Sequence, residues 1–143
     1  MRKKIICVDF DGVIHSYKSG WKGARNIPDE PVTGALQWLY IMSGHFDVQI
    51  YSARSRYFGA RRAMKLWLWK WACKEWDLPL DPDHPDNNVP CELPNNYFRY
   101  HMKFPTKKPP AWITIDDRCF LFKGTFPTIE DIDGFSSWIR KEV

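Results

Sequence analysis

Acidic and hydroxyl side chains that could take part in metal or phosphate chemistry stand at three separate places in the sequence. They are Asp9 with Asp11, Ser52, and the adjacent pair Asp116 and Asp117. Carboxylates gathered at one place repel each other, and a hard divalent cation with oxygen ligands offsets that repulsion. If the fold brings these residues together, the sequence predicts a Mg²⁺ site.

A short apolar run precedes each of these side chains. Residues 4–8, 47–52 and 111–115 are rich in β-branched residues and are predicted to form buried strands. In a parallel α/β sheet, ligands bind at the carboxyl ends of the strands. We therefore expect the acidic and hydroxyl side chains to lie along one edge of the sheet. A turn beginning at Gly12 can bring the first two carboxylates to the same ligand.

Helices are predicted between and after these strands. Residues 32–43 and 57–76 have the apolar spacing of amphipathic helices, and residues 128–142 are predicted to form a closing helix. The order strand, helix, strand predicts a right-handed parallel βαβ unit. The expected fold class is a three-layer, Rossmann-like α/β fold with a mostly parallel sheet. Trp67 and Trp71 fall outside the predicted core face of the second helix, and the following segment, a partner chain or a ligand could cover them.

Size and composition favour one soluble domain. The chain has 143 residues, of which 44% are hydrophobic and 27% charged, so we predict a single domain over 1–143 with a Pro-rich excursion at about 77–110. The net charge of +4 suits an anionic substrate and is far from a histone-like balance. Four cysteines without a CxxC pair signal neither a zinc site nor a disulfide framework, which fits the cytoplasm. The apolar run before Asp9 is too short for a signal peptide or a membrane span.

Each of these features also has a plain structural interpretation. Asp-x-Asp-Gly occurs in turns and calcium loops, but His15, Tyr17 and Lys18 occupy positions where a calcium loop needs acids. Ser52 could cap a following helix, and Asp116 could end a strand.

Basic residues near these motifs have two interpretations as well. Arg54 could belong to a solvated helix face or contact a phosphate, with about equal weight. His15, His45, His84 and His101 show no metal-ligand spacing, so surface or loop roles are expected, and His15 alone is close enough to Asp11 to merit a test.

Taken together, the motifs resemble those of the haloacid dehalogenase-like (HAD-like) phosphohydrolases. The first family motif is an apolar strand followed by Asp-x-Asp-Gly, and residues 5–14 read IICVDFDGVI. The second, a strand ending in Ser or Thr, is similar to VQIYSAR at 48–54, and the fourth, a strand ending in paired acids, is similar to ITIDDR at 113–118. The third is a lysine. Lys103, Lys107 and Lys108 are candidates, and we favour Lys108 because it opens a Lys-Pro sequence directly before the last strand.

The resemblance implies an enzyme, a magnesium-dependent phosphatase that hydrolyses phosphomonoesters through an aspartyl-phosphate. Asp9 would be the nucleophile, and Asp11 would be the acid and base partner. Ser52, Ala53, Arg54 and Lys108 would bind the substrate phosphate. The metal ligands implied are Asp9, Asp11 (through its backbone carbonyl), Asp116 and Asp117, the last of which could act through water or orient Lys108.

The intervals between the motifs leave no room for a large cap domain, so the site should be open. In the family, an open site accompanies large substrates, such as nucleic-acid ends or phosphoproteins, or oligomers whose neighbour supplies a lid. We therefore expect a phosphorylated substrate, either a small molecule or a nucleic-acid end, no membrane partner, and compatibility with a homo-oligomer. The rival hypotheses are a catalytically weak nucleic-acid or protein binding module on the same fold, and a phosphotransferase with the same residues.

Overall fold

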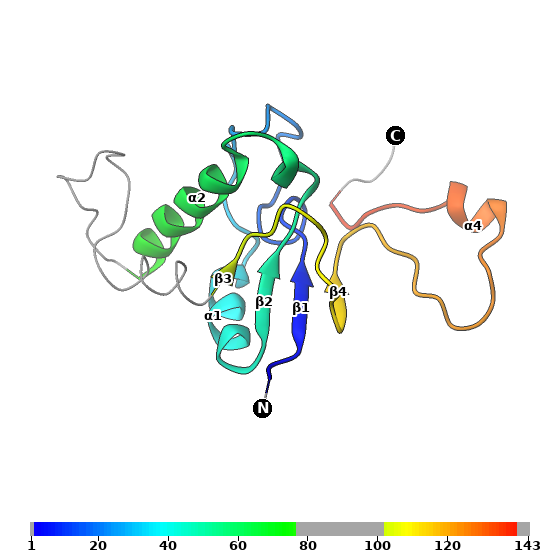
Figure 1. Ribbon diagram of the computed structural model, residues 1–143. Coiled ribbons are helices and arrows are strands. Elements are labelled where there is room, and N and C mark those ends of the chain that lie inside the picture. The colour runs from blue at the N-terminus through cyan, green and yellow to red at the C-terminus, as the bar shows by residue number, and fades with distance from the viewer. Residues whose placement is uncertain (1, 77–101, 140–143) are drawn as a thin grey trace.

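The computed structural model describes residues 2–76 and 102–139, and its centre is a four-stranded, all-parallel sheet (Figure 1). The strands are β1 (Ile5–Val8), β2 (Asp47–Ile50), β3 (Met102–Lys103) and β4 (Ile113–Ile115). Their order is β3-β2-β1-β4, which puts β1, the strand that leads to Asp9, between two neighbours. The predicted parallel pairing of the first two strands is confirmed, with Ile5 opposite Asp47 and Val8 opposite Ile50.

Two long helices follow the first two strands. They are α1 (Ala35–His45) and α2 (Ala60–Glu75), with a short 3₁₀ helix η1 (Ala53–Arg56) between β2 and α2. Both long helices begin after a glycine in the left-handed region, Gly34 for α1 and Gly59 for α2. Each therefore starts about three residues later than predicted, because the residues before the glycine form turns.

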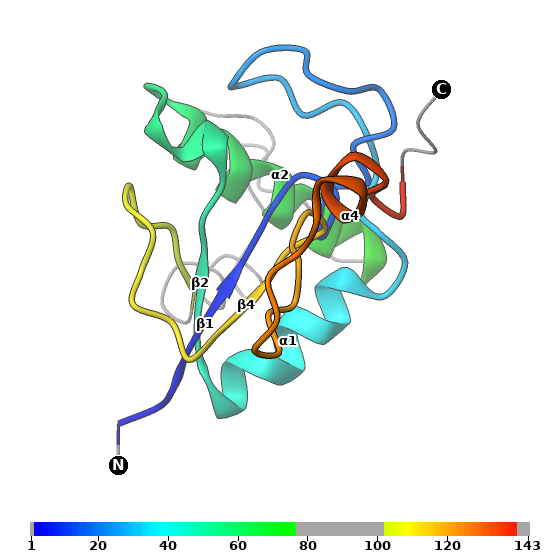
Figure 2. The same cartoon turned by 90° about the vertical axis from the view of Figure 1, so that its right-hand side faces the viewer.

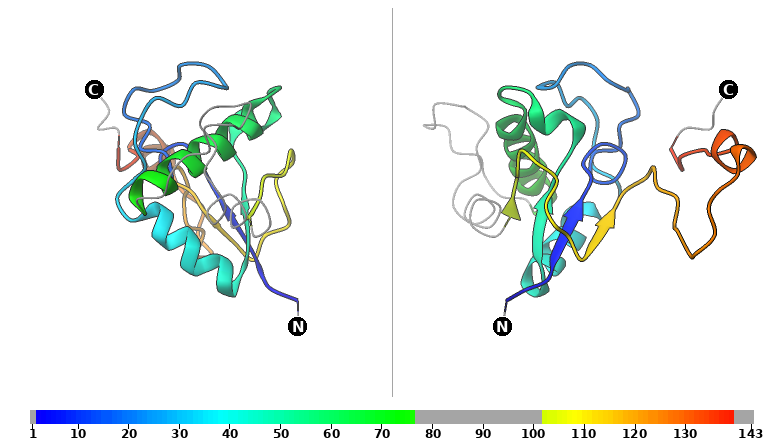
Figure 3. Two further views of the ribbon diagram at one scale, coloured as in Figure 1. Left: turned by 90° about the vertical axis from the view of Figure 1, so that its left-hand side faces the viewer. Right: turned by 45° about the vertical axis from the view of Figure 1, so that its right-hand side comes forward.

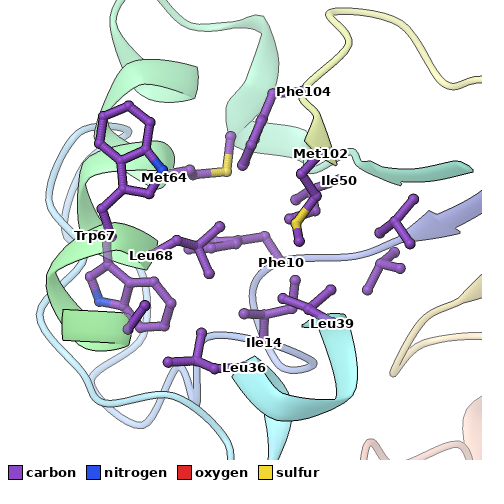
Figure 4. Packing of buried hydrophobic residues seen from close by; sticks show 14 of the residues in the cluster. Phe10, Ile14, Leu36, Leu39, Ile50, Met64, Trp67, Leu68, Met102 and Phe104 are labelled. Atoms are coloured by element: carbon purple, nitrogen blue, oxygen red, sulfur yellow. The ribbon is translucent and has the colours of Figure 1, made fainter. Parts of the chain in front are cut away.

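The helices bury one face of the sheet. Leu36 and Leu39 of α1 and Met64 and Leu68 of α2 belong to the same buried cluster as Val8 and other strand residues (Figure 4). Figure 2 shows α1 on one side of the strands and residues 104–112 passing along the other side. Within the described residues no helix covers that second face, so the three-layer prediction is correct only for its mixed α/β character and its parallel sheet.

Strand β3 was missed because it lies inside the predicted Pro-rich excursion and has only two residues. A run that short has no readable periodicity, although Met102 is buried and pairs with Val48. Most of that excursion, residues 77–101, lies outside the described residues.

The predicted closing helix is much shorter than expected. Helix α4 covers only Ile129–Asp133 and is capped by Thr128, whose side chain accepts a hydrogen bond from the Asp131 amide. Gly134 ends it, and residues 134–139 are not helical, while 140–142 lie outside the described residues. Helices in proteins are stabilised mainly by burying an apolar face, and Ile129 is 75% exposed here.

The segment after β4 leads away from the sheet and then returns to it (Figure 3). The returning end is fixed by Trp138, whose indole Nε1 donates a hydrogen bond of 2.9 Å to the carbonyl oxygen of Gly12. The turn after β1 therefore contacts a residue close to the other end of the described chain. No helix in 2–76 or 102–139 has both the length and the apolar character needed to cross a bilayer.

Candidate active site

Three carboxylates meet where β1 and β4 end. Asp9 follows β1, and Asp116 and Asp117 follow β4; one oxygen from each can be chosen so that all three lie within 4.8 Å of one another. The strand ends are tied together because the Asp9 amide donates to the carbonyl oxygen of Ile115 at 2.9 Å. Parallel pairing of β1 with β4 thus places acids that are more than a hundred residues apart at one edge of the sheet, as the sequence predicted.

These carboxylates line a cavity of about 440 Å³ together with other chemically useful side chains. Ser52 and Ala53 line it from the end of β2, and Lys108 lines it from the segment before β4. The remaining lining residues are Cys7, Asp11, Tyr17, Trp21, Tyr51, Thr114 and Arg118. The structure therefore brings every residue expected at the site to one cavity, with the exception of Arg54.

Burial and repulsion between like charges dominate the electrostatics of the acidic cluster. Burial and the negative charge of Asp116 raise the pKa of Asp9 to about 8, against a weaker opposing effect of the hydrogen bond from the Phe10 amide to the Asp9 carboxylate. Burial is also the main cause that raises the pKa of Asp117. A divalent cation would remove this repulsion, and three carboxylate oxygens within one coordination sphere fit its preference for oxygen ligands.

Gly12 closes the turn that makes this cluster possible. Its φ of 85° lies in the left-handed region, and a Cβ at this position would stand 2.3 Å from Oδ2 of Asp117. Its amide donates to the carbonyl oxygen of His15 at 2.8 Å. A side chain at this position would meet both backbone strain and a direct collision with one of the acids.

Asp11 faces a different environment from Asp9. Both of its carboxylate oxygens accept from Arg54, Oδ2 from Nε at 2.9 Å and Oδ1 from Nη2 at 3.0 Å, and Oδ1 also accepts from His15 Nδ1 at 2.8 Å. Burial alone would raise the pKa of Asp11, but the hydrogen bonds from His15 and Arg54 and the charge of Arg54 outweigh it and hold the pKa below its usual value. The two acids of the Asp-x-Asp motif therefore differ in protonation, with Asp11 ionised.

Arg54 is an internal residue. Its side chain is fully buried, and Nη1 donates to the carbonyl oxygens of Gly23, Ala24 and Asn26 at 3.0 to 3.2 Å. In this structure its guanidinium contacts Asp11 and the backbone of residues 23–26. These contacts take the place of the phosphate contact expected from the sequence.

His15 lies in the loop between β1 and α1, as one of the two expected roles had it, but it is buried, so the surface role is wrong. Its Nδ1 contacts Asp11, and its Nε2 accepts from the Asp29 amide at 3.2 Å. An acceptor at Nε2 requires the neutral tautomer with the proton on Nδ1, which then donates to Asp11. The signal available in the sequence was the spacing of four residues between Asp11 and His15.

Ser52 caps the 3₁₀ helix η1 and also lines the cavity. Its Oγ accepts from the Arg54 amide at 3.2 Å and caps η1, while the side chain of Ser55 accepts from the Ser52 amide. The cap interpretation is confirmed. Because the cap uses Ser52 as an acceptor, its hydroxyl hydrogen remains able to donate towards the cavity.

The lysines differ clearly in position. Lys108 lines the cavity, whereas Lys103 Nζ lies 3.0 Å from Oδ2 of Asp47 at the opposite end of β2. Lys107 is exposed and does not line the cavity. Arg118, which the sequence analysis did not assign, adds a second cation to the cavity; its place directly after the acid pair was the available signal.

We predict that Gly12→Ala will disrupt the acidic cluster, because the new methyl group must displace Asp117. Gly34→Ala is a matched control, since Gly34 has nearly the same φ, 83°, but no atom within 4 Å of its ideal Cβ. Both variants should lose about 1 kcal/mol of stability from backbone strain. Only Gly12→Ala should also lose stabilisation by Mg²⁺ in thermal unfolding. Equal Mg²⁺ responses in the two variants would contradict the steric argument.

A second prediction concerns the pH dependence of unfolding. A carboxyl whose pKa is raised on folding stabilises the protein at low pH, and this contribution is lost as the pH rises from about 4 to about 8. At a hundredfold excess over its Kd, Mg²⁺ should raise the melting temperature by on the order of 10 °C at pH 8. The rise should be smaller at pH 6.

The Asp9→Asn variant is the control for that measurement. It lacks the titrating group, so its response to Mg²⁺ should be weaker and should depend less on pH. A wild-type Mg²⁺ response that is absent, or equal at the two pH values, would show that Asp9 is not part of a cation site.

Comparisons with known proteins identify no relative of this chain. No protein-family model matches the chain, and neither the curated proteins nor the solved structures contain a match. The assignment of the site therefore depends on the chain's own geometry: a mixed α/β fold whose parallel sheet delivers three clustered carboxylates to a cavity that also contains Ser52 and Lys108.

Proposed function

We propose that the chain is a magnesium-dependent phosphatase with a HAD-like core, which hydrolyses phosphomonoesters through an aspartyl-phosphate on Asp9. The observation that supports this most is the cluster of Asp9, Asp116 and Asp117, with one oxygen from each within 4.8 Å, in the same cavity as Ser52 and Lys108. Carboxylates alone repel a phosphate. Such a cluster serves a phosphate ester only when a cation neutralises the acids and other cations hold the phosphate oxygens.

Asp9, Asp116 and Asp117 would hold the Mg²⁺. When bound, the cation supplies positive charge that lowers the repulsion between the nucleophile and the phosphate. The Phe10 amide, which donates to Oδ1 of Asp9 at 2.8 Å, fixes the direction of the carboxylate. This hydrogen bond would hold the Asp9 carboxylate in the same orientation before and after a cation binds.

In the first half-reaction, a carboxylate oxygen of Asp9 attacks phosphorus. The Asp9 oxygen–phosphorus bond forms, the bond from phosphorus to the ester oxygen breaks, and the departing alkoxide takes a proton. In the second, a water oxygen attacks the same phosphorus, the Asp9 carboxylate leaves, and the water gives up its proton. The net reaction converts the ester and water into the alcohol and inorganic phosphate.

Asp11 is the proton carrier in this proposal. The ionised state that Arg54 and His15 maintain suits the second half-reaction, in which a base must take the proton from water. In the first half-reaction the same carboxylate would relay a proton from solvent to the leaving oxygen. Arg54 and His15 act here as positioning residues, because both hold the Asp11 carboxylate and neither lines the cavity.

Lys108, Arg118 and the Ser52 hydroxyl would bind the phosphate oxygens. All three line the cavity, and the Ser52 hydroxyl is oriented by the capping bond that its oxygen accepts from the Arg54 amide. Donors fixed in this way stabilise charge in the transition state without having to reorient during the reaction.

A phosphatase screen with and without Mg²⁺ tests the proposal directly. The wild-type chain should release phosphate from at least one class among sugar phosphates, nucleotides and phosphorylated oligonucleotides. Asp9→Asn should abolish this release while keeping the fold, because the amide has the same shape but cannot act as nucleophile or anionic ligand. Activity in Asp9→Asn near the wild-type value would rule out the mechanism. Transfer of phosphate to an added alcohol in place of water would identify a phosphotransferase.

A comparison of two lysine variants tests the assignment of the phosphate-binding cation. Lys108→Ala should lower kcat/KM by on the order of a hundredfold, which corresponds to about 3 kcal/mol of transition-state stabilisation. Lys103→Ala removes a lysine of the same region that pairs with Asp47 away from the cavity, and it should change kcat/KM by less than about threefold. If Lys103→Ala proves to be the damaging change, the assignment of Lys108 is wrong.

A further inference from the structure

One side of the cavity is aromatic. Tyr17, Trp21 and Tyr51 line it together with the acidic cluster and the two cations. Trp21 is 47% exposed, although it is the largest apolar side chain of the segment before α1 that reaches the cavity. An indole ring kept half exposed beside a charged cavity is a surface on which another flat ring can stack.

The Trp21 ring is held in place by its neighbours. The guanidinium carbon of Arg54 lies 4.8 Å from the ring centroid, and the Tyr57 ring lies 5.9 Å away at a tilt of 49°. Arg54 itself is fixed by its bonds to Asp11 and to the carbonyl oxygens of residues 23–26. A ring supported by a fixed guanidinium loses little freedom when a ligand stacks on it, which favours binding.

The segment that presents these rings is also anchored. Both the amide and the hydroxyl of Ser19 donate to the Asp29 carboxylate, at 2.8 and 2.6 Å, and Trp67 Nε1 donates to the Asp29 carbonyl oxygen at 3.1 Å. Tyr17 adopts a φ of 59°, the one positive φ among the described residues other than glycine. Strain of this kind persists only where surrounding contacts impose it. The aromatic side of the cavity is therefore a preformed surface.

The indole and the acidic cluster share one cavity. The Trp21 ring contacts Arg54, Arg54 contacts Asp11, and both Trp21 and Asp11 line the cavity that contains Asp9, Asp116 and Asp117. A ring bonded directly to the phosphate, as in an aryl phosphate, would remain close to the acids. A ring joined to the phosphate through a spacer such as a sugar can extend away from the acids towards Trp21.

We propose that this aromatic surface, formed by Tyr17 and Trp21, binds the base of a nucleotide, so that the substrate class is nucleoside phosphates. The proposal rests on the phosphatase function proposed above and specifies its substrate. Stacking of a base on an aromatic ring tolerates any base, so the surface selects for the presence of a base more than for its identity. Lys108 and Arg118 in the same cavity supply the complementary charge for the phosphate.

Binding measurements in the Asp9→Asn background test the proposal, because that variant is expected not to consume the ligand. With Mg²⁺ present, a nucleoside 5′-monophosphate should bind at least about tenfold more tightly than ribose 5-phosphate, measured by calorimetry. Added Trp21→Ala should reduce this ratio to about one, and Trp21→Phe should restore most of it. Because the readout is a ratio, general weakening of the phosphate site cancels.

Trp112→Ala is the matched control. Trp112 is more exposed than Trp21, packs against Lys4 and does not line the cavity, so its removal should leave the ratio unchanged. A ratio near one in the parent, or a ratio that Trp21→Ala does not lower, overturns the proposal. Phosphotyrosine that binds as tightly as the nucleotide, with the same dependence on Trp21, overturns the substrate class.

The same measurements separate this proposal from the phosphatase function. Base-dependent binding without phosphate release by the wild-type chain would leave the aromatic surface supported and the hydrolytic function wrong. Phosphate release with no preference for a base would support the hydrolytic function and show that the proposed role of the aromatic surface is wrong. A 5′-phosphorylated tetranucleotide distinguishes the sources of the ligand: tighter binding than the mononucleotide supports nucleic-acid ends, and equal binding supports free nucleotides.

Discussion

The ion pair between Arg54 and Asp11 is the interaction on which the rest of the site depends. Its two hydrogen bonds, 2.9 and 3.0 Å long, join the turn after β1 to the 3₁₀ helix after β2. The remaining guanidinium donors hold the backbone of residues 23–26, and its flat face supports Trp21. One buried side chain thus fixes the direction of a carboxylate, the course of a loop and the position of an aromatic ring. A lysine could not replace it, since an ammonium lacks the planar, five-donor geometry.

The two halves of the Asp-x-Asp motif show how one short sequence supports two kinds of carboxylate. Asp9 lies among other acids, so burial and like charge favour its neutral form until a cation arrives. Asp11, two residues later, faces Arg54 and His15 and stays ionised. Environment, not residue type, separates their behaviour. A division of this kind is what acid and base chemistry at one site requires, and it supports the phosphatase proposal over a purely structural role for the motif.

Features set by local sequence could be predicted, and features set by distant contacts could not. The β-branched runs before Asp9, Ser52 and Asp116 located three strands, and parallel geometry then placed their ends together. The internal position of Arg54 depends on partners 28 to 43 residues away, which no local pattern reveals. The same holds for β3, where two residues pair with β2 across more than fifty positions. The closing helix was overpredicted because its apolar residues find no surface to cover.

The pairing of β1 with β4 also has a consequence for the order of folding. Ile6 pairs with Ile113, whereas β1 and β2 are joined by a nearby helix, so the β1–α1–β2 unit can form well before β4 joins the sheet. Until then Asp9 lacks the two acids, Asp116 and Asp117, whose negative charge raises its pKa. The repulsion arises only when β4 brings Asp116 and Asp117 into place. The electrostatic cost of the site therefore arises when the edge strand β4 docks. A cation that neutralises the acids would favour this docking step and would not affect the earlier formation of the β1–α1–β2 unit.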